Sequence, residues 1–192
     1  QIQVISLYGE HRRPTAEMLA ALDVVLFDLQ DIGCRIYTYI ATMMYFVDAC
    51  KDTDVELWIL DRPNPAGRPL DGLMLEPGHE SFVGSAALPT RHGLTMGELC
   101  NWYCSTRAPS CQRTIIEMKG YKPDQAPGFG WPTNERPWVN PSPNAASLNM
   151  ARCFPGTVLL EGTTLSEGRG TTIPLEVIGA PDFPATAALA LL

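Results

Sequence analysis

Two acidic side chains, six positions apart, stand among glycines and hydroxyls in the stretch EGTTLSEGRGTT, residues 161–172. Neither the Walker spacing nor the dinucleotide pattern G-x-G-x-x-G is present, so the stretch is not a phosphate cradle. Its glycines let backbone approach a ligand closely, and an arginine fork can hold a carboxylate. One interpretation is that Glu167 and Arg169 face a ligand while Glu161 holds the loop. The alternative is that Glu161 and Glu167 cap amides of the loop and that Arg169 pairs with one of them.

A second candidate site is the segment Asp-Arg-Pro-Asn-Pro at residues 61–65, directly after an apolar run. Prolines stiffen the chain around Asn64, which suits a pre-organised site. Asp61, Arg62 and Asn64 are therefore candidates for ligand contact, and a rigid turn with an Asp–Arg pair is the alternative. The segment Pro-Ser-Pro-Asn repeats the pattern and makes Asn144 a candidate for reading an amide.

A third group of polar residues stands at the entry to a predicted helix. Asp31, Arg35 and Tyr37 fall there, and a helix start can receive a polar ligand. Helix capping by Asp31 and core packing of Tyr39 form the alternative. His92 precedes another predicted helix and is either a proton-transfer group or a structural histidine.

Aromatic residues gather in the Pro/Gly-rich stretch that follows residue 120. Trp131 and Trp138, with Phe129, form either a stacking wall for a sugar ring or the core of a subdomain. Long ordered loops of this kind tend to be functional.

Composition narrows the class of protein. The chain has 192 residues, 45% of them hydrophobic, and a net charge of -7. That charge argues against nucleic acid as a partner, and no apolar run reaches the roughly 18 residues of a membrane span. The six cysteines form no C-x-x-C pair and the histidines lie far apart, so no metal site is expected. Free thiols are predicted, with a Cys104–Cys111 disulfide as the alternative.

The elements that must position these residues alternate between strand-like and helix-like segments. Strands are predicted at residues 2–7, 24–27, 55–60, 114–118 and 157–160, and helices at residues 15–22, 37–50, 95–103 and 184–192. We expect the 24–27 strand to be buried on both faces of a parallel sheet. The fold class is α/β: a Rossmann-like layered domain with parallel strands, followed by the start of a smaller α+β domain. The boundary is placed near residue 110, giving residues 1–110 and 111–192.

In such a fold, ligands bind outside the carboxyl ends of the strands. Asp28 and Asp31 follow the 24–27 strand, and Asp61 follows the 55–60 strand. Their positions predict a site at this edge of the sheet.

The ordered motifs resemble one known family over nearly the whole chain. They are SLYGEHRRPTAEML, VLFDLQDIGCRIYTYIATM, LDRPNPAGRPLDGLML, SFVG, RHGLTMGEL, MKGY, PSPN and EGTTLSEGRGTTIPLEVIGAP. In this order they resemble the exo-β-N-acetylmuramidase (NamZ) family of bacterial glycoside hydrolases.

The resemblance implies a two-domain enzyme that needs no cofactor or metal and has its cleft between a Rossmann-like and a smaller domain. Its substrates would be peptidoglycan-derived muramyl saccharides, from whose non-reducing end it releases N-acetylmuramic acid, in the periplasm or outside the cell. The family's Ser-Pro-Glu-His-Gly motif, with the proposed catalytic acid, is expected upstream of Gln1, and more of the C-terminal domain after residue 192. The alternative is a non-catalytic glycan-binding module of the same fold.

Within the resemblance, roles can be assigned to the polar motifs. Glycoside hydrolysis generally uses two carboxylates, and Asp61 or Glu167 would supply or support the second of them. Arg169, Arg35 and Arg62 are candidates for binding the lactyl carboxylate, and Asn64 and Asn144 for binding the acetamido group and ring hydroxyls.

Overall fold

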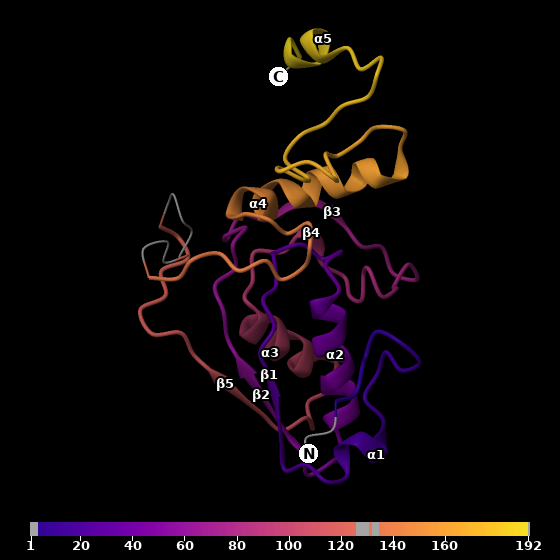
Figure 1. Cartoon of the computed structure of the whole chain (residues 1–192). Coiled ribbons are helices and arrows are strands. Elements are labelled where there is room, and N and C mark those ends of the chain that lie inside the picture. Colours follow the sequence, from indigo (N-terminus) through magenta and orange to yellow (C-terminus); the bar gives the residue numbers. More distant parts are fainter. Residues whose placement is uncertain (1–3, 126–130, 132–134, 192) are drawn as a thin grey trace.

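A three-stranded parallel sheet organises the molecule. The computed structural model of the chain describes residues 4–125, 131 and 135–191 (Figure 1). The sheet consists of β1 (Val24–Phe27), β2 (Glu56–Leu60) and β5 (Arg113–Ile116) in the order β1-β2-β5. Leu57 pairs with Val25 on one side and with Arg113 on the other. These strands confirm three of the sequence predictions to within two residues at either end.

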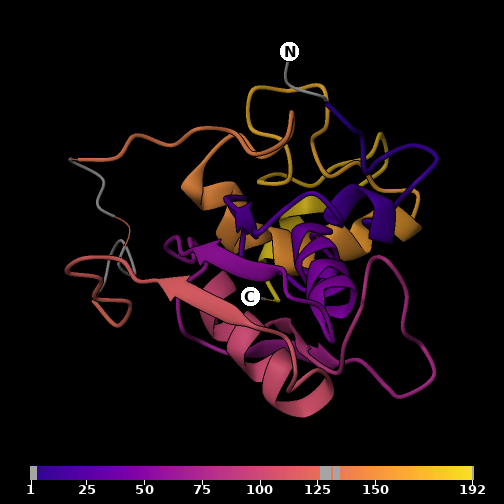
Figure 2. The same cartoon turned by 90° about the horizontal axis from the view of Figure 1, so that it is seen from below.

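Two helices connect the parallel strands and cover one face of the sheet. Helix α2 (Tyr39–Cys50) joins β1 to β2, and α3 (Met96–Arg107) lies between β2 and β5 (Figure 2). Since the chain moves across the sheet in one direction, right-handed crossovers place both helices on the same face. Leu57 and Ile59 are fully buried in the core that these helices form with the sheet. Helix α3 begins with the predicted capping box of Thr95 and Glu98.

The opposite face of the sheet is more open. The side chain of Leu26 is 61% exposed and that of Ile116 is 42% exposed. The prediction that residues 24–27 are buried on both faces is therefore wrong. The reason is that β1 is an edge strand, and the helices that pack on the sheet, α2 and α3, share the other face.

The connections outside the sheet are less regular. The short helix α1 (Ala16–Leu19) starts at the predicted cap Thr15. An antiparallel pair, β3 (Asp71–Met74) and β4 (Pro89–Arg91), lies within the long loop between β2 and α3. The strand predicted at residues 2–7 is absent from its described part, residues 4–7, and residues 1–3 lie outside the described range.

The C-terminal part is built on helix α4 (Leu148–Thr157), followed by the 3-10 helix η1 (Val158–Gly162) and the short helix α5 (Ala185–Leu189). The strand predicted at residues 157–160 is wrong, because this apolar run continues the helix instead. A run of four such residues does not distinguish a strand from a buried helical turn. The helix predicted at residues 184–192 is confirmed over α5.

A second core joins the C-terminal part to the segment after β1. Met150, Ala151 and Phe154 of α4 pack with Ile32 and Cys34, so residues distant in sequence share one cluster. Strand β5 lies beyond residue 110 and still extends the sheet of the first part.

Further global features concern thiols, metals and membranes. All six cysteines are free thiols, and five of them are buried, so the alternative Cys104–Cys111 disulfide is not formed. Within residues 4–125, 131 and 135–191, no cluster of three or more ligating side chains could hold a metal ion. No helix in the same part of the chain combines the length and the apolar character of a membrane span.

Candidate active site at the strand ends

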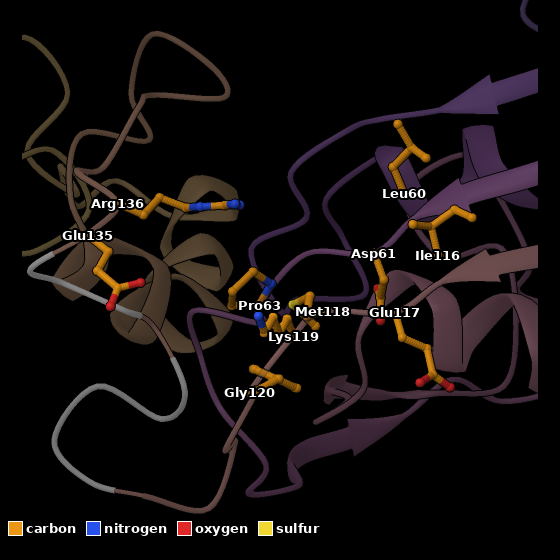
Figure 3. Close-up of a pocket in the computed structure, with 11 residues that line it drawn as sticks. Leu60, Asp61, Pro63, Ile116, Glu117, Met118, Lys119, Gly120, Glu135 and Arg136 are labelled. Carbon is orange, nitrogen blue, oxygen red and sulfur yellow. The ribbon is translucent and has the colours of Figure 1, made fainter.

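A cavity of about 850 Å³ opens at the carboxyl ends of β2 and β5. Asp61 follows β2 and Glu117 follows β5 (Figure 3). Each of these two neighbouring parallel strands is therefore followed by a carboxylate residue that lines the cavity. The residues that line it are Leu60, Asp61, Pro63, Ile116, Glu117, Met118, Lys119, Gly120, Tyr121, Glu135 and Arg136.

Two smaller cavities adjoin the first. One, of about 310 Å³, shares Arg136 and is lined further by Asp28, Leu29, Gln30, Tyr39, Arg62, Trp131, Pro137, Val139, Asn140 and Pro141. The other, of about 230 Å³, shares Asp61, Glu117, Met118 and Tyr121 and extends to Thr95, Gly97, Glu98, Asn101 and Ile115 at the start of α3. We call these three hollows, which share lining residues, the strand-end cleft.

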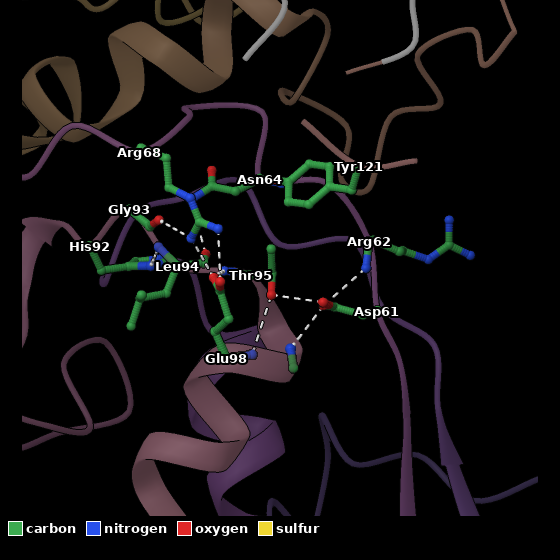
Figure 4. A network of polar contacts seen from close by, with 11 residues as sticks. Asp61, Arg62, Asn64, Arg68, His92, Gly93, Leu94, Thr95, Glu98 and Tyr121 are labelled. Carbon is green, nitrogen blue, oxygen red and sulfur yellow. Dashed lines mark hydrogen bonds and ion pairs between the residues drawn. The ribbon is translucent and has the colours of Figure 1, made fainter. Parts of the chain in front are cut away.

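Asp61 sits against the beginning of α3. Its Oδ1 accepts hydrogen bonds from the backbone N–H of Gly97 at 2.9 Å and of Arg62 at 3.1 Å. Its Oδ2 accepts from the Thr95 hydroxyl at 2.8 Å (Figure 4). These bonds fix the carboxyl group at the positive end of a helix dipole.

Burial raises the pKa of Asp61 above the usual aspartate value, although the hydrogen bonds from Gly97, Thr95 and Arg62 act in the opposite direction. The described residues offer Asp61 no cationic side chain as a partner. A carboxyl group with a raised pKa in a hollow is suited to proton transfer.

Glycine at position 97 makes this contact possible. A Cβ atom there would lie 2.6 Å from Ile115 Cγ2 and 3.0 Å from the Asp61 carboxyl carbon. The close approach of helix and strand end therefore requires the missing side chain.

An ion pair supports the same helix end. Arg68 donates to both oxygens of Glu98, at 2.5 and 2.8 Å. Burial alone would raise the pKa of Glu98, but the bonds from Arg68 and Thr95 hold it below the usual glutamate value. Arg68 was not among the candidates from sequence.

Asn64 does not face the cleft. It is 3% exposed; its amide Nδ2 donates to the Leu94 carbonyl at 3.0 Å, and its Oδ1 accepts from the Ala66 backbone at 2.9 Å. Both polar atoms thus hold loops together, which matches the rigid-turn alternative better than contact with a ligand.

His92 and Asp31 form a buried pair. His92 is 1% exposed, and its Nε2 lies 3.2 Å from Asp31 Oδ2. Because its Nδ1 accepts the Leu94 backbone N–H, the proton of a neutral ring is on Nε2 and is donated to Asp31. Asp31 also accepts from the Gly33 backbone at 2.7 Å. The pair connects two loops, so His92 has the structural role of its alternative. The alternative for Asp31, helix capping, is wrong, because the N-cap residue of α2 is Thr38.

The basic residues proposed for ligand binding are engaged elsewhere. Arg62 pairs with Asp28 at 2.6 Å, and both residues line the cavity of about 310 Å³. Arg35 donates hydrogen bonds to the backbone carbonyls of Leu73 and Leu88, and so supports the antiparallel pair of β3 and β4.

Tyr37 and Asn144 stand apart from the strand-end cleft as defined by its lining residues. The ring of Tyr37 packs against Tyr39 and Phe154, with centroids 4.9 and 6.4 Å away, and burial raises its pKa. Asn144 is half-buried beside the second core residue Ala145.

The stretch at residues 161–172 forms an ionic cluster of its own. Arg169 Nε lies 2.5 Å from Glu167 Oε1, and the Arg169 Nη2 group bonds Glu161. We call Glu161, Glu167 and Arg169 the glutamate–arginine clasp. Arg169 pairs with both carboxylates, an extension of the loop alternative, and none of the three residues lines the strand-end cleft.

The tryptophans are largely buried. Trp131 is 6% exposed, and its indole ring lies 5.1 Å from that of Trp138, which packs against the second core. Core packing thus describes Trp138, whereas Trp131 also lines the strand-end cleft. Phe129 lies outside the described residues.

Among the charged and tyrosine side chains that line the large cavity, sequence reasoning missed Glu117, Lys119, Tyr121, Glu135 and Arg136. The first three could have been found, since they directly follow β5 and the rule that ligands bind at strand ends applies to every strand.

The parallel sheet and the carboxylates at its carboxyl edge place the chain among layered α/β proteins with a strand-end site. A sequence model described as "Exo-beta-N-acetylmuramidase NamZ, N-terminal" matches residues 1–149, and its C-terminal counterpart matches residues 152–192. The chain belongs to this family, the NamZ family.

Individual relatives agree with this. The chain is 42% identical over 186 residues to the "Peptidoglycan beta-N-acetylmuramidase NamZ" of Bacillus subtilis (strain 168), covering 96% of this chain and 44% of that protein. The fold is similar to that of two DUF1343 family proteins from Bacteroides fragilis NCTC 9343. One has a TM-score of 0.87 and 34% identity, covering 96% of this chain and 49% of the other. The second has a TM-score of 0.78 and 37% identity, covering 88% and 47%. The chain thus spans about half the length of these relatives.

Proposed function

We propose that the protein is an exo-β-N-acetylmuramidase that releases N-acetylmuramic acid from the non-reducing end of peptidoglycan fragments. The observation that carries the proposal is the strand-end cleft of a NamZ-family chain, in which a half-buried aspartate with a raised pKa lies at a helix start. The name of the B. subtilis relative supports the choice of substrate.

The chemistry of the cleft fits glycoside hydrolysis. The reaction needs a proton donor for the leaving oxygen and a second carboxyl group that activates water or stabilises the oxocarbenium-like centre. Asp61 is the described residue best placed for one of these roles, because it is partly desolvated and held by three hydrogen bonds. Glu117 lines the same cavity and adds a second carboxylate.

Of the two carboxylates proposed from sequence, Asp61 is therefore preferred over Glu167. The Glu167 carboxylate is neutralised by Arg169, whereas Asp61 has no ion-pair partner among the described residues. A paired, screened carboxylate is a weaker proton-transfer group than one whose pKa is raised by burial.

The test is the release of free N-acetylmuramic acid from the disaccharide MurNAc-GlcNAc by the full-length protein, followed by chromatography. We expect release from this substrate and none from the corresponding GlcNAc-GlcNAc disaccharide. Binding of MurNAc-GlcNAc without any turnover would contradict the enzyme proposal and favour the alternative, a non-catalytic glycan-binding module of the same fold.

A further inference from the structure

The cations around the strand-end cleft differ in whether they already have a partner. Arg62 pairs with Asp28, and Arg68 pairs with Glu98 through two hydrogen bonds. The guanidinium group of Arg136 has no hydrogen-bond or ion-pair partner within residues 4–125, 131 and 135–191. The ammonium group of Lys119, in the same cavity, likewise has none in that part of the chain.

Arg136 lines two of the three hollows of the cleft. It lines both the large cavity at the strand ends and the smaller one beside Asp28. Figure 3 shows its side chain reaching toward the strand ends, where Pro63, Met118 and Lys119 lie, while the carboxylate of Glu135 is directed elsewhere.

The backbone at Arg136 is held in place, although its side chain has no partner among the described residues. The indole Nε1 of the buried Trp131 donates to the Arg136 carbonyl at 3.0 Å. Pro137 follows and restricts the backbone of the residue before it. Trp138 is tied in turn to the Ala145 carbonyl at 2.7 Å. A fixed backbone with a free side chain is the arrangement of a pre-organised binding residue.

The charges around Arg136 indicate which kind of ligand its side chain could bind. Asp61, Glu117 and Glu135 line the same cavity, and the chain carries a net charge of -7, so an anionic ligand is repelled unless a cation receives it. A guanidinium fork matches a carboxylate with two parallel hydrogen bonds. Muramic acid differs from glucosamine by a lactyl ether that ends in a carboxylate.

We propose that Arg136 is the residue that selects muramyl over glucosaminyl ligands by binding the lactyl carboxylate, with Lys119 as a supporting charge. This inference rests on the proposed function, because it takes a muramyl saccharide as the ligand. It replaces Arg35, Arg62 and Arg169, whose guanidinium groups have partners within the protein.

The experiment measures binding of N-acetylmuramic acid, its lactyl methyl ester and N-acetylglucosamine to the full-length protein by calorimetry. For Arg136→Gln we expect about 10- to 100-fold weaker binding of the acid, the loss of a charge-assisted pair. Binding of the ester and of N-acetylglucosamine should stay within about twofold, because neither carries the charge. Lys119→Gln should weaken binding of the acid only about two- to fivefold, as an exposed point charge.

Arg107→Gln is the matched control. Arg107 is exposed at the opposite end of α3 from Asp61, and binding of all three ligands should be unchanged. Equal loss of acid and ester in Arg136→Gln, or an unchanged preference for the acid, would overturn the inference. It would also fall if the wild-type protein bound acid and ester equally. Selective binding without turnover of MurNAc-GlcNAc would instead refute the proposed enzyme activity and leave the role of Arg136 intact.

Discussion

The strand-end cleft and the glutamate–arginine clasp contain the same kinds of residue in opposite states. In the cleft, Asp61 is held by backbone N–H groups and a hydroxyl, and its pKa is raised by burial. In the clasp, Glu161 and Glu167 share Arg169, so each carboxylate already has a cation beside it. The reactivity of a carboxylate therefore depends on whether a cation is already beside it.

The cleft also contrasts with the clasp in how it is supported. Asp61 depends on the start of α3, where a glycine, a threonine and the Arg68–Glu98 pair meet. The clasp lies in a loop whose backbone is held by hydrogen bonds of its own, such as those between Ser166 and Gly179. Substitutions in the two regions should therefore have different signatures, one in turnover and the other in stability.

The largest effect is expected for Asp61→Asn. The asparagine keeps an oxygen for the Gly97 N–H but cannot be ionised or transfer a proton. Turnover of MurNAc-GlcNAc by the full-length protein should fall by about 10²-fold or more, measured as the initial rate of MurNAc release. Asp54→Asn, at an exposed turn, is the control and should keep its rate. Near-normal turnover in Asp61→Asn would show that Asp61 does not take part in catalysis.

Gly97→Ala should show how closely the cleft depends on the helix start. The added methyl group meets Ile115 and Asp61, so we expect the free energy of unfolding to fall by about 1–3 kcal/mol in urea titrations. Gly156→Ala is the matched control, because it lies in α4 with nothing within 4 Å of the new Cβ. It should be neutral or stabilising by up to about 1 kcal/mol. Equal stability of the two variants would mean that the contact with Asp61 is not tight.

Thr95→Ala removes both a helix cap and one hydrogen bond to Asp61. Loss of the cap should lower the free energy of unfolding by about 1 kcal/mol. Since the Thr95 bond lowers the pKa of Asp61, its removal should raise that pKa further, which NMR titration of the carboxyl carbon can measure. Thr95→Ser keeps the hydroxyl and should resemble the wild type. An unchanged pKa in Thr95→Ala would refute the proposed coupling.

The sign of the pH dependence follows from the same shift. The folded protein holds the Asp61 proton more tightly than the unfolded chain, because the folded pKa is raised. The contribution of Asp61 to stability therefore decreases as pH rises from the ordinary aspartate value through the raised one. This slope should disappear in Asp61→Asn.

The smallest effect is expected for Glu167→Gln. Glutamine still accepts a hydrogen bond from Arg169, and that arginine is 43% exposed, so screening reduces the lost attraction. The free energy of unfolding should fall by less than about 1 kcal/mol, and turnover should stay within about threefold of the wild type. Glu161→Gln should have similarly small effects on the free energy of unfolding and on turnover. A loss of about 10²-fold in turnover for Glu167→Gln alone would break the contrast and return Glu167 to catalysis.

Local signals predicted much of the fold. The apolar run of β2 and the Thr95–Glu98 capping box were confirmed because each depends on neighbouring residues alone. The exposed side of β1 was not predictable, because a short apolar run looks the same in an edge strand and in a central one. The apolar run at residues 157–160 shows the same ambiguity, since it became helical.

The amino-acid sequence by itself determined the family, the parallel sheet and the position of Asp61 at a strand end. These follow from local patterning and the rule that strand ends gather ligands. Only the tertiary structure decided which charges are satisfied: His92 with Asp31, Arg62 with Asp28 and Arg169 with two glutamates. Among the residues that the structure describes, it likewise gives the Arg136 guanidinium group at the cleft no partner. The physical reason is that pairing depends on distance and burial, which sequence separation does not encode.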